Sequence, residues 1–483
     1  MKSMKTRLVS IVIMLSALMC GNVKADNVDL QTAKQIGAYY FNVVTGTKAP
    51  VSADKLELVQ QFDNPTLCIP ALYAFNVADN GFVVVSASNT TDPVLAYSPE
   101  GRIDNPNPAC RYILESYAKL ISQDQTCNAT PTANVKAMWD ELIDETFTCD
   151  LTSKAVLVKG KWGQGDPFAP SYNAMCPQIN GRPCLTGCVA TAMAMIIHYW
   201  KYPFKGGSPN GSVATTAWNN QTIRYKFLVD SNKFIYDSMP NQINSRSEWN
   251  YKRACGKLCF ACGVTVKMDW GLEASGALSR NVPGALSTWF KYSNEATHIQ
   301  RNNYTDDHWL RILHNEIDSN ARPVYYSACD PDTTHGKDAR HAFVIAGSSP
   351  ANKKLFYIRW GWDGGSDGFY TLAPMSSIEP SGGYRFTSEH AMVYKIFPEQ
   401  LGIEENTSFT TSPAYPNPAT DHIMIPVDMS LNAYLSVFSI DGKLIDNIVV
   451  PAGTKEYRLN LQNYAPGNYI YRLNGSAVKF AVL

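Results

Sequence analysis

The stretch CLTGCVATAMAMIIHYW, residues 184–200, decides how the middle of this chain folds. It places Gly187 and Cys188 directly before a run of small and apolar helix formers. We expect a buried helix that ends before the Tyr202-Pro203 pair. A thiol in the first turn of a helix lies at the positive end of the helix dipole, which favours the thiolate. The stretch therefore predicts a nucleophilic cysteine, and a packed or disulfide-bonded cysteine is the alternative.

A cysteine nucleophile needs a base, and two of the eight histidines open apolar strands. His341 begins HAFVIAG and His390 begins HAMVYKI, so each would have rigid support behind it. His198 follows Cys188 on the same predicted helix and cannot fold back to the thiol. A helix-borne thiol followed 153 residues later (341 − 188) by a strand-borne imidazole favours His341 over His390. The alternative for either histidine is a half-buried structural role.

Acyl transfer also needs hydrogen-bond donors for the oxyanion. The backbone N–H of Cys188 is one candidate because it lies at the predicted helix start. Gln164, in the glycine-bracketed loop WGQG, offers a side-chain amide as the second. Because loop glutamines are common, Gln164 alone does not identify such a site.

The overall composition is that of a folded protein with several domains. The chain has 483 residues, 45% of them hydrophobic and 17% charged, and its 42 basic and 42 acidic residues balance. At about 150 residues per domain we expect roughly three domains, and no nucleic-acid or anionic-membrane partner. After the Cys188 helix, an amphipathic helix is expected over 307–320. Strand patterns follow in RPVYYSA, HAFVIAGSS, KLFYIRWGW, DGFYTL and HAMVYKIF, which predicts an α+β fold.

Residues 1–25 have the pattern of a signal peptide. The basic start MKSMKTR precedes the apolar run LVSIVIMLSALM, and VKA resembles a cleavage site, so we expect the mature chain to begin near Asp26. The apolar run is too short for an ordinary membrane span, and no later stretch reaches the roughly 18 apolar residues that a span needs. Cys20 raises the alternative of a lipoprotein, but Met19 before it is not a small residue.

Export would permit disulfides, and the cysteine count leaves one thiol over. Of twelve cysteines, Cys20 lies in the signal segment, so eleven (12 − 1) remain. The run CGKLCFAC places Cys255, Cys259 and Cys262 at helical spacing, and no second ligand cluster follows. We interpret these three as core packing or a disulfide rather than zinc ligands. The sequence predicts no metal and no cofactor.

Four motifs carry a family resemblance. KWGQGDPF, GCVATAMA, HAFVIAG and RWGWDGGSDGFY occur in this order and together resemble the streptopain family of papain-fold cysteine peptidases. The resemblance covers most of residues 155–398 and implies a papain-like catalytic domain over 151–398. It implies Cys188 as nucleophile, His341 as general base and acid, Gln164 in the oxyanion hole, and Trp360 beside the histidine, shielding it from water.

The chain departs from the family pattern at two positions. Arg359 stands where the family often has asparagine, and arginine cannot accept the ring N–H of a histidine. Either a backbone carbonyl or a side chain such as Asp363 then orients His341, or activity is reduced. Arg340 replaces the usual glycine before the histidine and could alter subsite preference or partly occlude the cleft.

One more segment resembles part of the family's substrate cleft. WGLEASGA, residues 270–277, resembles a cleft-lining stretch in which Ser275 and Gly276 could offer hydrogen bonds to a peptide. The alternative is a plain surface turn.

The flanking parts resemble accessory domains. Residues 26–150 resemble the family's inhibitory propeptide through YAFNVADNGFVVVSASNTTDPVLAYSPEG, which implies an α+β intramolecular inhibitor and a zymogen cut between about 127 and 161; a permanent accessory domain is the alternative. After a linker at 399–411, residues 412–483 resemble a type IX secretion sorting domain through AYPNPATDHI, DGKLI, PGNYIYRL and KFAVL. This implies a small all-β sandwich that engages the type IX secretion machinery, and a carbohydrate- or cell-binding module is the alternative.

Together these features predict a secreted or surface-displayed cysteine endopeptidase that acts on protein or peptide substrates. Its export would begin with the Sec signal and end with passage across the outer membrane. A catalytically weak relative that serves as a surface binding protein is the main alternative, and Arg359 and Arg340 keep it open. A third possibility is an amidase or transpeptidase that uses the same cysteine and histidine.

Overall fold

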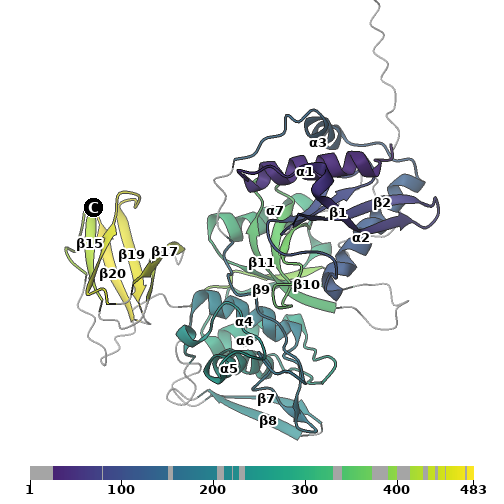
Figure 1. Ribbon diagram of the computed structural model, residues 1–483. Coiled ribbons are helices and arrows are strands. Elements are labelled where there is room, and N and C mark those ends of the chain that lie inside the picture. Colours follow the sequence, from purple (N-terminus) through teal and green to yellow (C-terminus); the bar gives the residue numbers. More distant parts are fainter. Residues whose placement is uncertain are drawn as a thin grey trace, which may run out of the picture.

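A computed structural model describes most of the chain after residue 25 (Figure 1). The predicted signal segment 1–25 and nearly all of the predicted linker 399–411 lie outside the described residues. The described ranges are 26–78, 80–150, 156–203, 212–219, 221–227, 234–329, 340–372, 390–399, 414–427, 433–440, 444–451, 453–473 and 476–483.

The N-terminal part combines three helices with a four-stranded meander. The carboxylate of Asp29 caps the first helix by accepting from the backbone N–H groups of Gln31 and Thr32, and Gly46, at φ 58°, ends it. Asn107 caps the second helix, which begins at Pro108. The elements are α1 (Leu30–Thr45), β1 (Leu56–Asn64), β2 (Ile69–Val77), β3 (Phe82–Ser86), β4 (Val94–Ser98), α2 (Pro108–Thr126) and α3 (Ala133–Ile143).

The N-terminal and middle parts share one ten-stranded sheet. Its strand order is β1-β2-β3-β4-β13-β12-β11-β10-β14-β9. The two parts join where β4 pairs antiparallel with β13 (Gly368–Thr371), with Tyr97 opposite Phe369 and Ala96 opposite Tyr370. The backbone hydrogen bonds of this seam build the N-terminal part into the fold. The other strands are β9 (Thr297–Gln300), β10 (Val324–Cys329), β11 (Arg340–Ser348), β12 (Leu355–Arg359) and β14 (Ala391–Tyr394).

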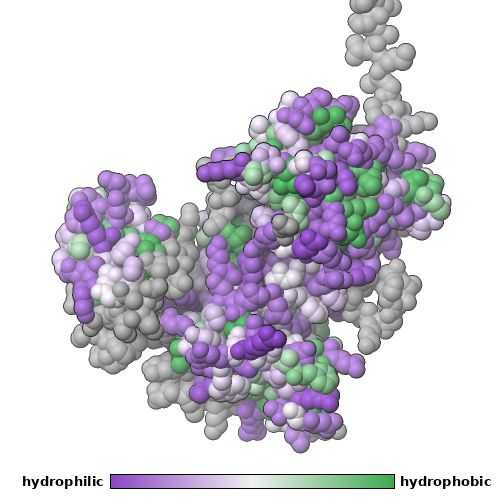
Figure 2. Space-filling model, in the orientation of Figure 1, coloured by the Kyte–Doolittle hydropathy of each residue, from purple (hydrophilic) through white to green (hydrophobic). Residues whose placement is uncertain are grey.

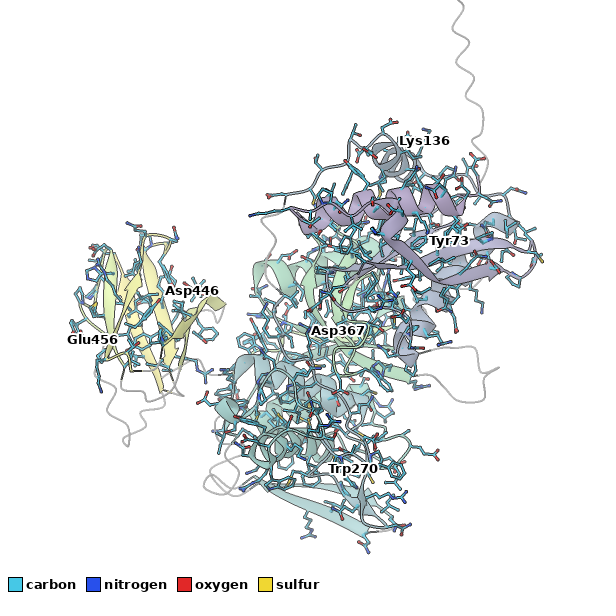
Figure 3. All side chains as sticks on the ribbon, viewed as in Figure 1. Tyr73, Lys136, Trp270, Asp367, Asp446 and Glu456 are labelled. Carbon is cyan, nitrogen blue, oxygen red and sulfur yellow. The ribbon has the colours of Figure 1, made fainter. Side chains whose placement is uncertain are left out.

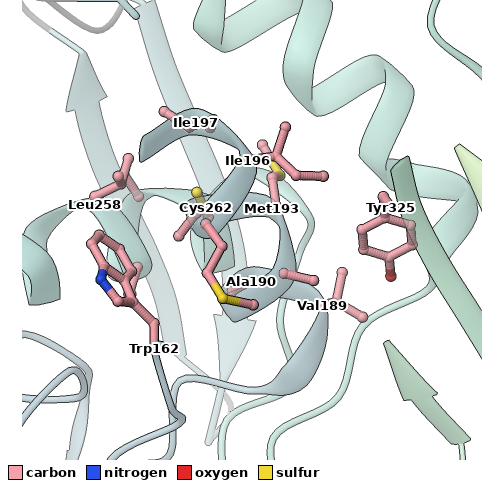
Figure 4. Close-up of a cluster of buried hydrophobic side chains, with 14 of the residues drawn as sticks. Trp162, Val189, Ala190, Met193, Ile196, Ile197, Leu258, Cys262 and Tyr325 are labelled. Carbon is pink, nitrogen blue, oxygen red and sulfur yellow. The ribbon is translucent and has the colours of Figure 1, made fainter. Parts of the chain in front are cut away.

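The two faces of this sheet pack against different helices. On one face, Ala342 and Val344 of β11 join the core cluster of α4 (Cys188–Trp200) and α5 (Trp249–Thr265), drawn in Figure 4. On the other face, Phe343 and Ile345 join the cluster of α2 and α7 (Asp306–His314). Because strand side chains alternate between faces, the face on which each β11 or β12 residue lies is fixed.

Smaller elements complete the middle part. The predicted helix over 307–320 is α7 followed by a π-helical turn at Asn315–Ser319. A hairpin of β7 and β8, which the sequence patterns did not indicate to us, precedes α5. The bounds are β5 (Gln178–Ile179), β6 (Arg182–Pro183), β7 (Ser212–Trp218), β8 (Gln221–Phe227), α6 (Val282–Phe290) and 3-10 turns at Ala53–Lys55, Tyr236–Ser238, Ser279–Asn281 and Arg301–Asn303.

The C-terminal part is an all-β unit with its own core. Two sheets, β15-β18 and β17-β16-β19-β20, enclose a cluster that includes Ile423, Leu435 and Phe480. It touches the middle part where Phe438 stacks on Trp200, with ring centroids 6.1 Å apart. The strands are β15 (His422–Pro426), β16 (Ala433–Ser439), β17 (Leu444–Val450), β18 (Glu456–Asn460), β19 (Gly467–Leu473) and β20 (Ser476–Val482).

The surface is largely polar. Figure 2 shows hydrophilic residues over most of the visible face, with hydrophobic residues gathered mainly over the N-terminal part. Among the described helices, none combines the length and the apolar content that crossing a membrane would require.

Candidate active site

The backbone before α4 delivers Cys188 to the helix start. Cys188 is the first residue of α4, and Gly187 before it has φ 83° and ψ 139°. A Cβ on Gly187 would lie 2.7 Å from the Met268 side chain and 2.9 Å from the Ser275 carbonyl oxygen. Only glycine fits this conformation and this space. The thiol is partly buried at the positive end of a helix whose remaining length lies in the core.

His341, the second residue of β11, is held by a backbone carbonyl. Its Nε2 lies 2.7 Å from the carbonyl oxygen of Trp360, and the indole Nε1 of Trp362 lies 3.3 Å from the same nitrogen. A carbonyl can only accept, so we assign the ring proton to Nε2, and Trp362 then covers the ring rather than donating to it. This tautomer leaves the lone pair on Nδ1.

The surroundings keep the thiol and the imidazole uncharged. The Cys188 sulfur accepts a hydrogen bond from the backbone N–H of Ala342, the residue after His341. Burial nevertheless raises the pKa of Cys188 above its usual value. Burial lowers the pKa of His341 to about 4, against a smaller opposing effect of the Trp360 carbonyl. Both shifts favour the uncharged form of each group in this covered cavity.

Arg359 does not take the place of an orienting amide. Its guanidinium donates to the carbonyl oxygen of Val158 at 3.0 Å and to the carboxylate of Asp367 at 2.9 Å. In the register of β12, Arg359 lies opposite Val344, on the sheet face away from the cluster that holds Phe343 and Trp360. The sequence analysis expected either a backbone carbonyl or a side chain such as Asp363 to orient His341. The group that contacts the His341 ring nitrogen is the backbone carbonyl of Trp360.

A cavity of about 280 Å³ connects the predicted site residues. Gln164 borders it on a loop that is tied to the α4 entry, because the backbone N–H of Thr186 donates to the Gln164 carbonyl at 3.0 Å. Gly165, at φ 79°, has no room for a Cβ against Asn173. The structure thus brings together six of the predicted residues around the cavity: Gln164, Cys188, Ser275, Arg340, His341 and Trp360.

Two predicted cleft residues use their polar groups within the protein. The Ser275 hydroxyl donates to the carbonyl oxygen of Leu185 at 2.7 Å, so it ties the 270–277 segment to the α4 entry loop. Gly276 is not among the cavity-lining residues, and its N–H and C=O both pair with Asp269, at 2.9 and 2.8 Å. The Gly276 N–H is thus engaged within the protein, and the cleft role expected for Gly276 stays a prediction. The hydrogen bond from Ser275 to Leu185 fixes the position of the 270–277 segment beside the loop that leads into α4.

The two tryptophans of the WGW motif have different surroundings. The Trp360 ring is fully buried and packs on Phe343 and Tyr370, with centroid distances of 4.9 and 5.1 Å. The ring of Trp362, which is 37% exposed, lies with its centroid 6.0 Å from that of His341. Trp362, which the sequence analysis did not select although the motif contains both tryptophans, is thus a second candidate for shielding His341, and the role predicted for Trp360 stays a prediction.

The alternative base has a structural environment. His390 is buried, and its Nδ1 lies 2.9 Å from the Tyr326 hydroxyl. Burial lowers the pKa of His390 to about 3. His198 lies within α4 with its Nε2 2.8 Å from the Met239 carbonyl oxygen. Neither histidine borders the cavity that contains Cys188.

The N-terminal part covers the cavity. Pro108, Ala109, Tyr112 and Ile113, all from the first turns of α2, line it opposite Cys188. The α2 cap Asn107 donates from Nδ2 to the carbonyl oxygen of Gly365 at 2.9 Å. These contacts hold the first turns of α2 over the cavity.

Ion pairs fasten the two parts together on either side of the β4–β13 seam. Lys354 Nζ lies 2.9 Å from the buried carboxylate of Asp92, and Lys161 Nζ lies 2.9 Å from the carboxylate of Glu100, which is partly exposed. Both pairs join an acidic residue of the N-terminal part to a lysine of the middle part, so docking is electrostatically complementary.

The three cysteines of α5 are packed in the core and are not bridged. Cys255, Cys259 and Cys262 are fully buried on α5. Ten cysteines have described side chains, and each of these is a free thiol. Within the described ranges, no cluster of three metal-ligating side chains occurs.

Three family models match successive parts of the chain. The peptidase C10 family matches residues 162–370, the Spi protease inhibitor matches 25–121, and the secretion system C-terminal sorting domain matches 413–481. The matched ranges correspond to the middle, N-terminal and C-terminal parts.

Individual relatives agree with these matches. Streptopain of Streptococcus pyogenes is 28% identical over 329 residues, which cover 65% of this chain and 77% of streptopain. The thiol protease/hemagglutinin PrtT of Porphyromonas gingivalis is 26% identical over 79% of this chain and 43% of PrtT. A prointerpain A fragment of Prevotella intermedia superposes with a TM-score of 0.54 at 25% identity, covering 70% of this chain and 98% of the fragment. The predicted α+β, papain-like fold with a propeptide is confirmed.

Proposed function

Because the chain belongs to the peptidase C10 family and is a cysteine peptidase, we propose that it is an endopeptidase made as a zymogen, with Cys188 and His341 as its catalytic pair. The observation that carries this proposal is the Trp360 carbonyl contact, which supports the assignment of the His341 proton to Nε2. Nδ1 is then the nitrogen that can take the proton of the thiol. The substrates would be proteins or peptides outside the cell.

The reaction would begin with proton transfer from the Cys188 sulfur to Nδ1 of His341. The thiolate attacks the scissile carbonyl carbon, and the oxyanion is stabilised by the Cys188 backbone N–H and the Gln164 amide. His341 donates its proton to the departing amine, which leaves an acyl-enzyme. Water, deprotonated by His341, attacks the thioester and releases the acid and the free thiol.

The N-terminal part would inhibit the peptidase until it is removed. The first turns of α2 border the cavity, and burial disfavours both ions of the thiolate–imidazolium pair. Cleavage between about 127 and 161, followed by loss of the β4–β13 seam, would open the cleft and hydrate the pair. We place the inhibitory part at 26–150, the catalytic part at 151–398 and the sorting part at 412–483.

The C-terminal part would address the enzyme for export. The sorting-domain match indicates a secreted or cell-surface protein. We propose that a Sec signal at 1–25 starts this export and that the type IX secretion machinery recognises residues 412–483. The linker at 399–411 would be the place where the sorting part is released.

Casein hydrolysis under mild reductant tests the proposal. The chain from Asp26 to Leu483 is compared with its Cys188→Ala twin, each incubated until the unmodified chain has processed itself. We expect only the unmodified chain to cut. If neither cuts although both are folded, the binding-protein alternative is favoured; equal cutting by both would exclude Cys188 as nucleophile. Ligated products would indicate a transpeptidase.

A further inference from the structure

A buried ion pair between Arg359 and Asp367 contacts the backbone of Trp360, the residue whose carbonyl accepts from His341. Arg359 Nη1 lies 2.9 Å from Asp367 Oδ2, and the two side chains are only 5% and 4% exposed. Burial acts against the charge on Arg359, but Asp367, Tyr357 and Glu100 together outweigh burial and raise the pKa of the guanidinium. Asp367 lies near the centre of the middle part in Figure 3.

Asp367 uses its other oxygen on the Trp360 backbone. Oδ1 accepts the Trp360 N–H at 2.9 Å, and the neighbouring Ser366 carbonyl accepts the Trp360 indole N–H at 3.0 Å. Trp360 is therefore fixed at its backbone and at its ring by two consecutive residues. The carbonyl of the same tryptophan accepts the His341 Nε2–H at 2.7 Å.

We propose that Asp367, held by Arg359, is a positioning residue that sets the orientation and tautomer of His341 through Trp360. The inference rests on the proposed role of His341 as the base. A carbonyl carries no full charge, so its hold on the imidazolium depends on its placement. A small shift of Trp360 would deprive Nε2–H of its acceptor and release the ring.

This arrangement gives Arg359, which departs from the family pattern, a structural role. Its side chain lies on the wrong sheet face to reach His341, but there it fixes the carboxylate that fixes Trp360. Neither partner is stable alone in this environment, because an unpaired buried charge is costly. The same pair also anchors Val158 through the Arg359 Nε contact, which links the start of the catalytic part to the site.

Asp367→Asn tests the proposal because asparagine keeps an acceptor but loses the ion pair. The matched control is Arg322→Met, which breaks the Arg322–Glu316 pair, 4.0 Å apart, in which the Arg322 side chain is 12% exposed and that of Glu316 is 2% exposed. Full chains are activated under reductant, with trypsin added and then inhibited if a variant does not process itself. We measure kcat and KM on a peptide substrate across pH, and the rate of Cys188 alkylation by iodoacetamide through peptide mass spectrometry.

We expect Asp367→Asn to lower kcat by about 10- to 100-fold with little change in KM. We also expect the alkaline limb of the kcat/KM profile to move to lower pH, since the imidazolium is less well held. The rise of the alkylation rate with pH should move to higher pH, since the thiolate loses part of the positive charge that favours it. Arg322→Met should lower the thermal midpoint without moving either profile. If Asp367→Asn does not fold, Arg359→Lys, which keeps the charge but not the planar contact, carries the same expectation.

The outcomes separate this inference from the proposed function. The positioning role would be overturned if neither the kcat/KM profile nor the alkylation profile shifts along the pH axis in Asp367→Asn or Arg359→Lys. This holds whether the activity of the variant is intact or is lowered as in Arg322→Met. An unmodified chain that is no faster than Cys188→Ala would overturn the proposed function, and the inference with it.

Discussion

The glycine that precedes the nucleophile offers a quantitative test of how α4 is built. In Gly187→Ala the new Cβ would lie 2.7 Å from Met268 and 2.9 Å from the Ser275 carbonyl oxygen, at φ 83°. The backbone conformation alone costs a non-glycine residue about 1–3 kcal/mol. Overpacking against the two neighbours adds about 1–3 kcal/mol, and the backbone oxygen cannot move aside as a side chain can. We expect a total loss of about 3–4 kcal/mol, near the middle of these ranges.

Gly181→Ala is the matched control, because Gly181 has φ 72° but nothing within 4 Å of the added Cβ. Both substitutions are placed in the Cys188→Ala chain, so that self-digestion cannot distort the measurement. Urea unfolding is followed by tryptophan fluorescence. The difference between the two variants isolates the contact cost, about 1–3 kcal/mol. A Gly187→Ala chain that loses no more stability than Gly181→Ala would refute the close packing of the α4 entry.

Three other outcomes follow from the site. Gln164→Ala should lower kcat by about 10²- to 10³-fold with a small effect on KM, since it removes one oxyanion donor. Steady-state kinetics on the activated chain would measure this change. An unchanged kcat would exclude Gln164 from the oxyanion hole. Trp362→Ala should weaken the shielding of His341 and lower kcat/KM by about tenfold, whereas an unaltered kcat/KM would leave the shielding to Trp360. Burial raises the pKa of Glu100, but Lys161 and its other partners outweigh burial and leave it below 4.5. Glu100 thus supports docking above its free pKa of about 4.5 and loses this contribution as the pH falls through the lowered value. Native gels of a nicked Cys188→Ala chain would follow dissociation of the N-terminal part, which should increase in that acidic pH range. Glu100→Gln should make this increase smaller. A Glu100→Gln chain that shows the full increase would contradict the role assigned to Glu100.

Much of the fold could be predicted because its signals are local. The helix of residues 188–200 follows from an unbroken apolar run, and the strands from HAFVIAG and KLFYIRWGW follow from short apolar runs bounded by turns. The β7–β8 hairpin was missed because apolar and polar residues are mixed in its two strands, so neither contains a long unbroken apolar run. The seam between β4 and β13 could not be predicted, since pairing between strands about 270 residues apart leaves no periodic trace.

By itself, the sequence determined which groups could do chemistry. It placed Cys188 at a helix start, His341 at a strand start and Gln164 in a glycine-bracketed loop, because nucleophile, base and amide have recognisable local contexts. It also raised the question of Arg359, whose side chain cannot accept a hydrogen bond.

Only the tertiary structure decided how these groups act together. It assigned the orienting role to the Trp360 carbonyl, because a backbone group has no letter of its own in the sequence. It brought Trp362 against His341 and the first turns of α2 over the cavity. It also placed Arg359 on the far face of the sheet beside Asp367. Each of these relations depends on strand register and on the faces of one shared sheet, which long-range packing sets.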